Sequence, residues 1–411
     1  MSGTVIVGAG QAGIQVASSL RELGYADRIL LVGDEPWAPY QRPPLSKSYL
    51  AGTAPENMLF MQEDAFFEAH RIETRFGARV VAIDRDLHQV NLETGEFLPY
   101  DRLVLATGTR NRQLPCVEGA MSGVLSLRTL DDARALADAL KSSRRIVVIG
   151  AGFLGLEAAT IARSRECDVC VIEAGPRPLG RVASTPVSAV VQRSHEAAGV
   201  RFHFEESVVA IHGDSGKVAS VEVRSGDRIP ADLVLVSIGV VPNVELAAAA
   251  GLAVHDGIVI DRNLRTEDAA IYAIGDCASF PFAADGDRMV RLESVQNAVD
   301  QARCVAGAIV GSPRAYDQVP LFWSDQAGLR LQTAGLTRGD ELIVIRGDAA
   351  SAAFSAFCYR EGRLVAVESV SRLPDHMQAR KLLAAGLSPS PAQAADTGFD
   401  LKSLLVAAVA A

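Results

Sequence analysis

Two apolar runs, separated by a glycine-rich turn and a segment of helical composition, form the clearest hydrophobic pattern in the chain. Residues 146–149 are all aliphatic and lead directly into the sequence GAGFLG at 150–155. An alanine-rich segment follows, and then a second apolar run at 169–172 that closes on Glu173. This order predicts a buried β-strand, a tight turn, an α-helix and a second strand.

Each glycine of this turn suits a separate task in a dinucleotide-binding βαβ unit. Gly150 permits the tight turn, Gly152 lets a pyrophosphate approach the backbone, and Gly155 allows close packing of helix and strand. The pyrophosphate is expected at the N-terminus of the helix. Glu173 follows the turn by about 20 residues, where such a unit places the acid that binds the adenosine ribose.

The N-terminus repeats the unit. The aliphatic residues 5–7 enter the sequence GAGQAG at 8–13, a helical segment follows, and the run at 29–32 precedes Asp34 and Glu35. Gly33 takes the place that Glu173 has in the other unit, so either Asp34 or Glu35 is expected to bind the ribose. A single glycine turn can arise from packing alone, whereas two complete units predict the binding of two dinucleotides.

The later strands predict the domain organisation. DRLVLATG at 101–108 recurs in form as DLVLVSIG at 232–239, which indicates that both dinucleotide-binding domains close with the same type of strand. Alternating patterns at 329–334, 341–346, 351–359 and 363–370 predict a C-terminal antiparallel sheet. We therefore predict an α/β fold with two Rossmann-like dinucleotide-binding domains, the second inserted in the first, plus a C-terminal antiparallel α+β domain. The expected bounds are 1–108 and 237–317, 109–236, and 318–411.

The returned part of the first domain offers further cofactor-binding groups. The apolar run 271–274 ends in Gly275 and Asp276, and the Asp276 carboxylate has the chemistry to accept a hydrogen bond from a ribityl hydroxyl. Glu293, Ser294 and Val295 open a predicted helix that runs through residue 309. The first backbone amides of that helix can face a ring that gains negative charge.

Composition and charge disfavour several classes of protein. The chain has 411 residues and a net charge of −9, which argues against nucleic-acid binding. Strand residues begin by Thr4, which leaves no room for a secretory signal, and the apolar C-terminal end is shorter than the ~20 residues of a membrane span, so a cytoplasmic location is expected.

Cys167 and Cys170 match CxxC, but Cys170 lies inside a predicted strand, whereas a redox pair of this type opens a helix. Neither the other cysteines nor the histidines show metal-ligand spacing, so no metal site is expected.

The chain resembles the two-dinucleotide flavoproteins of the glutathione-reductase type from residue 4 to about residue 310. The resemblance rests on the two glycine fingerprints, on DRLVLATG and DLVLVSIG, and on AIGDCA at 273–278. YQRPPLSK at 40–47, LESVQNA at 292–298 and FWSDQ at 322–326 narrow it to the ferredoxin reductases of bacterial oxygenase systems, of the putidaredoxin reductase type, over nearly the whole chain. In that family the first fingerprint holds FAD and the second holds NADH.

The resemblance also implies cofactor-binding residues. For FAD these are Gly8, Gly10, Ala12, Gly13, Asp34, Glu35, Arg42, Lys47, Ala106, Thr107, Gly108, Gly275, Asp276, Glu293, Ser294 and Val295, and more weakly Val80 and Arg128. For NADH they are Gly150, Gly152, Phe153, Leu154, Gly155, Glu157 and Glu173.

Three residues are candidates for a part in catalysis. Lys47 and Glu157 are expected to form an ion pair beside the flavin N5 atom, where the pair would steady the charge of the reduced ring and position the nicotinamide. The alternative is that both are ordinary exposed charges. Trp323 is expected to pack against the flavin or the nicotinamide ring, and the alternative is that it is a core tryptophan.

The resemblance implies an NADH-dependent ferredoxin reductase. Hydride from NADH would reduce FAD, and single electrons would pass to a two-iron ferredoxin that feeds a haem-thiolate monooxygenase or another oxygenase. Disulfide reductases carry a CxxxxC pair, and peroxide-reducing relatives a single cysteine, in the loop that reads RPPLSK here without a cysteine. The electrons are therefore expected to leave for a partner protein. A rubredoxin reductase of the same architecture and an NADH-sensing flavoprotein similar to apoptosis-inducing factor remain alternatives.

Charge bears on the choice of coenzyme and partner. Glu173 favours NADH because the 2′-phosphate of NADPH would place like charges in contact, although Arg177 or Arg181 could accept such a phosphate. Two-iron ferredoxins are usually acidic, so a negatively charged reductase needs a confined positive patch to bind one. Docking is expected where the FAD domain meets the C-terminal domain, near Arg303, Arg330 and Trp323.

Overall fold

The chain forms two compact units. The computed structural model describes residues 3–115 and 121–410. The first unit comprises Met1–Gln41, Pro55–Arg110 and Val240–Gln318, and the second unit comprises Arg42–Ala54, Asn111–Gly239 and Val319–Ala411. The short segment Arg42–Ala54 therefore belongs with the second unit. The bounds of the three expected domains stay a prediction.

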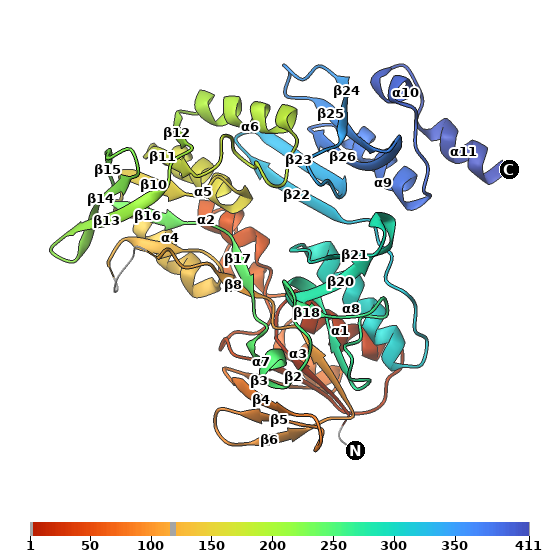
Figure 1. Ribbon diagram of the computed structural model, residues 1–411. Coiled ribbons are helices and arrows are strands. Elements are labelled where there is room, and N and C mark those ends of the chain that lie inside the picture. Colours follow the sequence, from red (N-terminus) through yellow and green to blue (C-terminus); the bar gives the residue numbers. More distant parts are fainter. Residues whose placement is uncertain (1–2, 116–120, 411) are drawn as a thin grey trace. The chain divides into compact units, whose positions relative to one another are not determined.

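A five-stranded parallel sheet forms the centre of the first unit. Its order is β19-β7-β1-β2-β3, and β2 and β3 are labelled in Figure 1. The strands are β1 (Thr4–Val7), β2 (Ile29–Gly33), β3 (Ile72–Phe76), β7 (Arg102–Leu105) and β19 (Ile271–Ala273). Helix α1 (Gln11–Glu22) follows β1 and packs against α8 (Val295–Ile309). The central strands are almost wholly apolar and buried, as expected of parallel strands.

Short elements complete the first unit. They are α3 (Asp64–Ala69), β4 (Val80–Asp84), β5 (Gln89–Leu92), β6 (Phe97–Pro99), β8 (Thr109–Asn111), β17 (Val240–Pro242), α7 (Glu245–Ala249), β18 (Ile258–Val259), β20 (Ala278–Phe282) and β21 (Arg288–Val290), with 3-10 turns η2 (Glu56–Leu59), η3 (Gly275–Cys277) and η4 (Ala283–Asp285). Strands β4, β5 and β6 form one three-stranded sheet, and β18, β20 and β21 form another.

The second unit contains a parallel sheet of the same design. Its order is β12-β11-β10-β16-β9. The strands are β9 (Val124–Ser126), β10 (Arg145–Ile149), β11 (Asp168–Glu173), β12 (Val200–Phe204) and β16 (Leu233–Val236), and the helices are α4 (Leu130–Ser142), α5 (Phe153–Ser164) and α6 (Thr185–Ala197). The loop segment contributes η1 (Pro43–Ser46) and α2 (Ser48–Ala51), which pack against α4 and α5. Both βαβ units expected from the glycine turns, β1–α1–β2 and β10–α5–β11, are confirmed.

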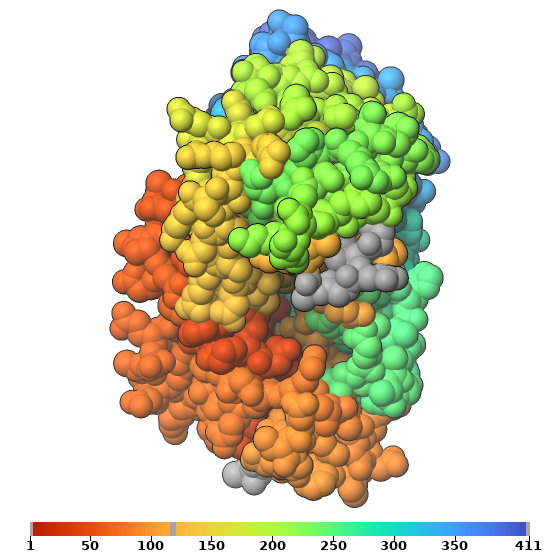
Figure 2. All heavy atoms as spheres, turned by 90° about the vertical axis from the view of Figure 1, so that its left-hand side faces the viewer, coloured from red at the N-terminus to blue at the C-terminus, as the bar shows by residue number. Residues whose placement is uncertain are grey.

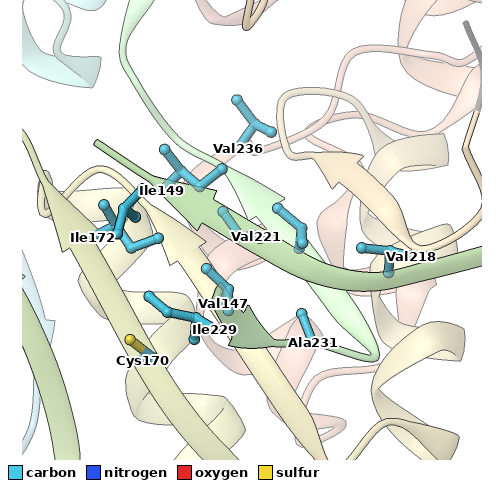
Figure 3. Close-up of a cluster of buried hydrophobic side chains, with 11 residues drawn as sticks. Val147, Ile149, Cys170, Ile172, Val218, Val221, Ile229, Ala231 and Val236 are labelled. Atoms are coloured by element: carbon cyan, nitrogen blue, oxygen red, sulfur yellow. The ribbon is translucent and has the colours of Figure 1, made fainter. Parts of the chain in front are cut away.

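An antiparallel sheet covers one face of this parallel sheet. It consists of β13 (Val208–Asp214), β14 (Lys217–Val223) and β15 (Arg228–Pro230), and it is the green layer that faces the viewer in Figure 2. Val218, Val221 and Ile229 from this layer pack against Val147 and Cys170 of the parallel sheet (Figure 3). The expected placement of Cys170 inside a strand, with Cys167 just before it, is confirmed, and burial in this core raises the pKa of the Cys170 thiol to about 11.

A five-stranded antiparallel sheet occupies the C-terminal part of the second unit. Its order is β22-β23-β26-β25-β24, and α9 packs against β23 and β26. The elements are β22 (Leu321–Gln326), β23 (Leu329–Gly335), β24 (Leu342–Gly347), β25 (Phe354–Arg360), β26 (Arg363–Val370), α9 (Leu373–Ala384), α10 (Pro391–Ala395) and α11 (Lys402–Ala410). The strand expected at 351–359 begins only at Phe354, because Asp348 and Ser351 accept and donate hydrogen bonds that hold residues 348–353 in a turn. The predicted fold class is confirmed.

The part of the chain that the structure describes contains neither a metal-binding cluster nor a membrane-spanning helix. Among residues 3–115 and 121–410, no group of three or more histidine, cysteine or acidic side chains is arranged to hold a metal ion. In the same part of the chain, no helix has the length and apolar character needed to cross a membrane.

Candidate functional site

The first glycine of each turn holds the backbone in a conformation that other residues rarely adopt. Gly8 has φ of +115°, and Gly150 has φ of +102°. A Cβ atom on Gly8 would lie 2.1 Å from the Ala106 carbonyl oxygen, and one on Gly150 would lie 2.2 Å from that of Ser237. Both turns therefore need glycine for the same two reasons: a positive φ and close approach of the closing strand.

Of the other glycines in the two turns, some are needed for close packing and some leave room for a ligand. A Cβ on Gly13 would lie 1.9 Å from the Gly8 oxygen, and one on Gly155 would lie 2.4 Å from the Gly150 oxygen. A Cβ on Gly10 or Gly152 would meet nothing within 4 Å. Gly10 and Gly152 thus leave open backbone at a helix N-terminus, and this cradle fits a pyrophosphate. Ala12, Phe153 and Leu154 lie in the first turns of α1 and α5.

The acid after the second strand differs between the two units. In the second unit, Glu173 accepts hydrogen bonds from the backbone nitrogens of Ala151 at 2.7 Å and Gly175 at 2.8 Å. In the first unit, a Cβ on Gly33 would lie 2.6 Å from the Cβ of Ala9, so an acid has no room at that position. This packing explains why the acidic residues Asp34 and Glu35 follow one and two positions later.

Those two acids differ in burial and in their contacts. Asp34 is exposed, whereas Glu35 is half-buried and accepts a hydrogen bond from the Tyr40 hydroxyl at 2.5 Å. Both side chains stay candidates for the ribose contact.

The remaining expected FAD residues of the first unit lie after β7, at the start of β4, in η3 after β19, and around the start of α8. Thr107 donates to the Asn243 carbonyl at 2.7 Å, and the Asn243 amide donates back at 2.9 Å, which fixes the turn that contains Ala106 and Gly108. Val80 begins β4, and Gly275 and Asp276 form η3. Ser294 is the N-cap of α8 and accepts a hydrogen bond from Asn297, while Glu293 forms an ion pair with Arg291 at 2.8 Å and Val295 is the first helical residue.

Gln301 is a supporting residue that the sequence did not suggest. Its buried side-chain oxygen accepts a hydrogen bond from the backbone nitrogen of Gly275 at 2.7 Å. Gln301 therefore holds the turn that presents Asp276. It lies two helical turns into α8, where the sequence alone gives no signal for a contact with η3.

The expected ion pair between Lys47 and Glu157 is present within the second unit. Lys47 Nζ lies 2.8 Å from Glu157 Oε1. The Glu157 side chain is 5% exposed and that of Lys47 is 23% exposed, so the alternative of two ordinary surface charges is wrong. Ser46 donates a hydrogen bond to Glu157 Oε2 at 2.5 Å, and Ser324 donates one to Oε1. Burial and these three contacts make the Glu157 carboxylate a fixed anion beside a partly accessible cation.

Other expected residues of the second unit lie at separate places. Arg42 donates to the carbonyl oxygen of Arg128 at 2.7 Å. The ring of Phe153 packs on Phe322 at 4.3 Å between centroids. Trp323 is 40% exposed on the outer face of β22, so it is not a core tryptophan.

The arginines expected at the docking site each carry an acidic neighbour. Arg303 of the first unit lies 3.7 Å from Asp300, and Arg330 of the second unit lies 3.0 Å from Asp325. All four side chains are at least a quarter exposed. Such exposed pairs contribute little to stability and leave the arginines accessible.

Two dinucleotide-binding folds in one chain define an oxidoreductase that transfers reducing equivalents between two nucleotide cofactors. Comparison with known proteins agrees. Residues 3–302 match the pyridine nucleotide-disulphide oxidoreductase family, and residues 321–405 match the reductase C-terminal family.

Relatives cover nearly the whole chain. Rhodocoxin reductase of Rhodococcus erythropolis is 49% identical over 97% of this chain and 93% of its own length. The crystal structure of a ferredoxin reductase from Rhodopseudomonas palustris is 46% identical with a TM-score of 0.95, covering 98% of this chain and 99% of the other. The putidaredoxin reductase solved in a covalent complex with putidaredoxin is 41% identical with a TM-score of 0.97, covering 100% and 99%.

The chain belongs to the pyridine nucleotide-disulphide oxidoreductase family. It is a flavoprotein oxidoreductase whose cofactors are FAD and NAD(H).

Proposed function

We propose that the chain is an NADH-dependent ferredoxin reductase that supplies single electrons to a two-iron ferredoxin of an oxygenase system. The observation that carries this proposal is similarity over the whole length to rhodocoxin reductase and to the putidaredoxin reductase that was solved with putidaredoxin. The loop Arg42–Ala54 contains no cysteine, so a thiol relay at that position is absent. Electrons must therefore pass to a separate acceptor.

Each unit has the groups to hold one cofactor. The first unit would hold FAD through the open backbone at Gly10, the acids after β2, the turn at Thr107, Asp276 and the N-terminus of α8. The second unit would hold NADH through the open backbone at Gly152 and the carboxylate of Glu173. When bound, FAD accepts a hydride from NADH and releases the two electrons one at a time.

The Lys47–Glu157 pair would assist the hydride step by electrostatics. A cation fixed before the reaction stabilises negative charge that develops on a neighbouring ring without having to reorganise. Glu157 is held from two sides by serine hydroxyls, so it keeps the Lys47 ammonium in one place. The role of Lys47 is therefore to supply fixed positive charge, and the role of Glu157 is to position it.

Two contacts favour NADH over NADPH. Glu173 brings a negative charge to the position where a 2′-phosphate would lie. Arg177 is committed to its own loop, because its guanidinium donates to the carbonyls of Ala183 at 2.9 Å and Gly180 at 3.1 Å. Of the two arginines that could accept a 2′-phosphate, this leaves only the exposed Arg181.

The acceptor would contact exposed arginines. Arg303 and Arg330 are both more than half exposed, and an acidic ferredoxin would compete with Asp300 and Asp325 for them. Trp323 offers an exposed aromatic surface on the same strand as Asp325.

A two-step rapid-mixing experiment tests the function. Reduction of the FAD-loaded protein by NADH is followed first, and the reduced protein is then mixed with an oxidised two-iron ferredoxin or with a rubredoxin. Rapid oxidation by the ferredoxin and slow oxidation by rubredoxin are expected. Faster oxidation by rubredoxin would make the chain a rubredoxin reductase, and a long-lived reduced complex with both would favour the signalling alternative.

Lys47→Met tests the ion pair in the same assay. Reduction by NADH should slow at least roughly tenfold because fixed charge is lost, whereas oxidation by ferredoxin should change little. Lys141→Met is the matched control, since Lys141 is an exposed lysine whose ion pair with Asp138 lies on the surface. Equal slowing of both half-reactions would refute the assigned role.

A further inference from the structure

A row of buried polar side chains extends behind Glu157 within the second unit. Ser324 and Gln326 lie on the inner face of β22, and His195 projects from α6. All three are at most 2% exposed. Along β22 the outer residues Trp323 and Asp325 alternate with these two inner polar residues. Buried polar groups are unfavourable unless they are hydrogen-bonded, so two of them turned inward on one strand require partners.

The hydrogen bonds of this row all point in one direction. Nε2 of His195 lies 3.0 Å from Oε1 of Gln326. The amide Nε2 of Gln326 donates to Oγ of Ser324 at 3.1 Å. The Ser324 hydroxyl then donates to Oε1 of Glu157, the oxygen that also contacts Lys47.

The protonation state of His195 sets this direction. Among the described residues, Nδ1 of His195 has no hydrogen-bond partner, so a proton on that nitrogen would be a buried donor without an acceptor. Burial also lowers the pKa of His195, which keeps the ring neutral. The single ring proton therefore belongs on Nε2, where Gln326 Oε1 accepts it.

The orientation of the Gln326 amide follows from that proton. With its oxygen toward His195, the amide must present its N–H to Ser324. The Ser324 oxygen is then occupied as an acceptor, and its one hydroxyl proton goes to Glu157. A reversed amide would present a second acceptor to that proton and would compete with Glu157 for it.

We propose that His195, Gln326 and Ser324 are positioning residues that fix the Glu157 carboxylate so that it holds Lys47 in the geometry used for flavin reduction. This inference rests on the proposed function of the ion pair. Ser46 and Ser324 approach different oxygens of Glu157 and so fix the plane of the carboxylate. Gln326 and His195 act through Ser324, because Gln326 donates to the Ser324 hydroxyl and His195 contacts Gln326.

The first test reads the ring proton directly. The FAD-loaded protein is labelled with ¹⁵N-histidine, and long-range ¹H–¹⁵N correlations of the seven histidines are recorded, with His195→Gln used to assign the signal. A neutral ring with the proton on Nε2 is expected, and Gln326→Leu should shift this signal. A proton on Nδ1 would reverse the amide and overturn the proposal.

The second test measures flavin reduction at saturating NADH. Ser324→Ala should lower the limiting rate roughly tenfold, because a loosened catalytic geometry costs rate more than binding, and should leave the Kd for NADH unchanged. Ser324→Thr keeps the hydroxyl and should restore most of the rate. Ser355→Ala is the matched control: Ser355 is an equally buried serine of the same sheet whose hydroxyl bonds to Ser369 and Asp375.

The outcomes distinguish this inference from the function on which it rests. If Lys47→Met slows reduction and Ser324→Ala does not, the ion pair acts without the buried row and the inference is overturned. If Ser324→Ala and Ser355→Ala slow reduction equally, the effect is general loosening of the sheet, and the inference also fails. If Lys47→Met itself reduces at the normal rate, the proposed role of the ion pair falls, and the positioning role falls with it.

Discussion

Replacing Glu173 by glutamine should weaken NADH binding selectively. The two oxygens of Glu173 accept from the nitrogens of Ala151 at 2.7 Å and Gly175 at 2.8 Å. A glutamine side chain has one oxygen, so its NH₂ group must face one of these two N–H groups at a distance too short for two donors. The substitution therefore disturbs the glycine turn as well as the ribose contact.

The size of the effect follows from these contacts. An N–H group left without an acceptor in a half-buried site costs about 1–3 kcal/mol, and loss of a hydrogen bond to a charged group costs a similar amount. The unpaired N–H group is present with and without coenzyme, so only the lost ribose hydrogen bond changes affinity: about 1.5–3 kcal/mol corresponds to a Kd for NADH that rises roughly 10-fold to 150-fold. NADPH loses the same contacts but is relieved of charge repulsion, so the preference for NADH should fall at least about tenfold.

The assay is kcat/KM for NADH and NADPH with ferricyanide as acceptor, together with direct titration of the two coenzymes. Asp168→Asn is the matched control, because Asp168 lies at the other end of the same strand β11 and forms an exposed pair with Arg201. Such a pair contributes about 0–1 kcal/mol, and no change in coenzyme preference is expected. Equal losses for NADH and NADPH in Glu173→Gln, or a wild type that prefers NADPH, would refute the reasoning.

Three further predictions use other parts of the chain. Gly155→Ala should destabilise the fold by about 1–3 kcal/mol, because its Cβ would lie 2.4 Å from a backbone oxygen. Gly152→Ala should leave thermal stability unchanged and weaken NADH binding, because its Cβ would point into the open cradle. The reverse pattern would contradict the assignment of Gly155 to packing and Gly152 to coenzyme binding. Burial lowers the pKa of His376 to about 4, so the unfolded chain binds this proton at a higher pH than the folded protein does. The contribution of neutral His376 to the free energy of unfolding is therefore present above pH 6.5 and is lost as the pH falls towards 4. Between pH 7 and pH 5, the free energy of unfolding of His376→Asn, measured with denaturant, should fall by about 1–2 kcal/mol less than that of wild type. Arg303→Glu combined with Arg330→Glu should raise the KM for ferredoxin and flatten its salt dependence while ferricyanide reduction stays normal; unchanged ferredoxin kinetics at low salt would place docking elsewhere.

Local sequence was sufficient to predict the two βαβ units. A glycine that needs a positive φ, such as Gly150, and a strand that is apolar at every position leave few alternative structures for a short segment. The ion pair of Lys47 with Glu157 was also expected, but only through the resemblance to a family. The residues are far apart in sequence, and their contact depends on η1 and α2 packing against α4 and α5.

The buried row behind Glu157 could not be predicted from the sequence. His195 lies on the buried face of α6 with Val187 and Val191, but the periodicity of that face does not name the partner that satisfies a buried imidazole. Ser324 and Gln326 belong to FWSDQ, which supports the family resemblance but names no partner for either side chain. Their alternation with Trp323 and Asp325 was a signal that polar side chains face inward, yet it shows no partner until β22 is placed against α5.

The expected cofactor contacts are distributed differently in the two units, which predicts slower exchange of FAD than of NADH. The expected FAD contacts of the first unit come from six separate places, namely the β1–α1 turn, the end of β2, the start of β4, the end of β7, η3 and the start of α8. Release of a ligand held at so many places requires several contacts to break together, which favours a resident cofactor. The expected NADH contacts of the second unit lie mainly on the single β10–α5–β11 unit, with the acid already hydrogen-bonded to the glycine turn. A preformed site on one unit lets the coenzyme bind and leave without rearrangement, as a substrate consumed in every turnover must.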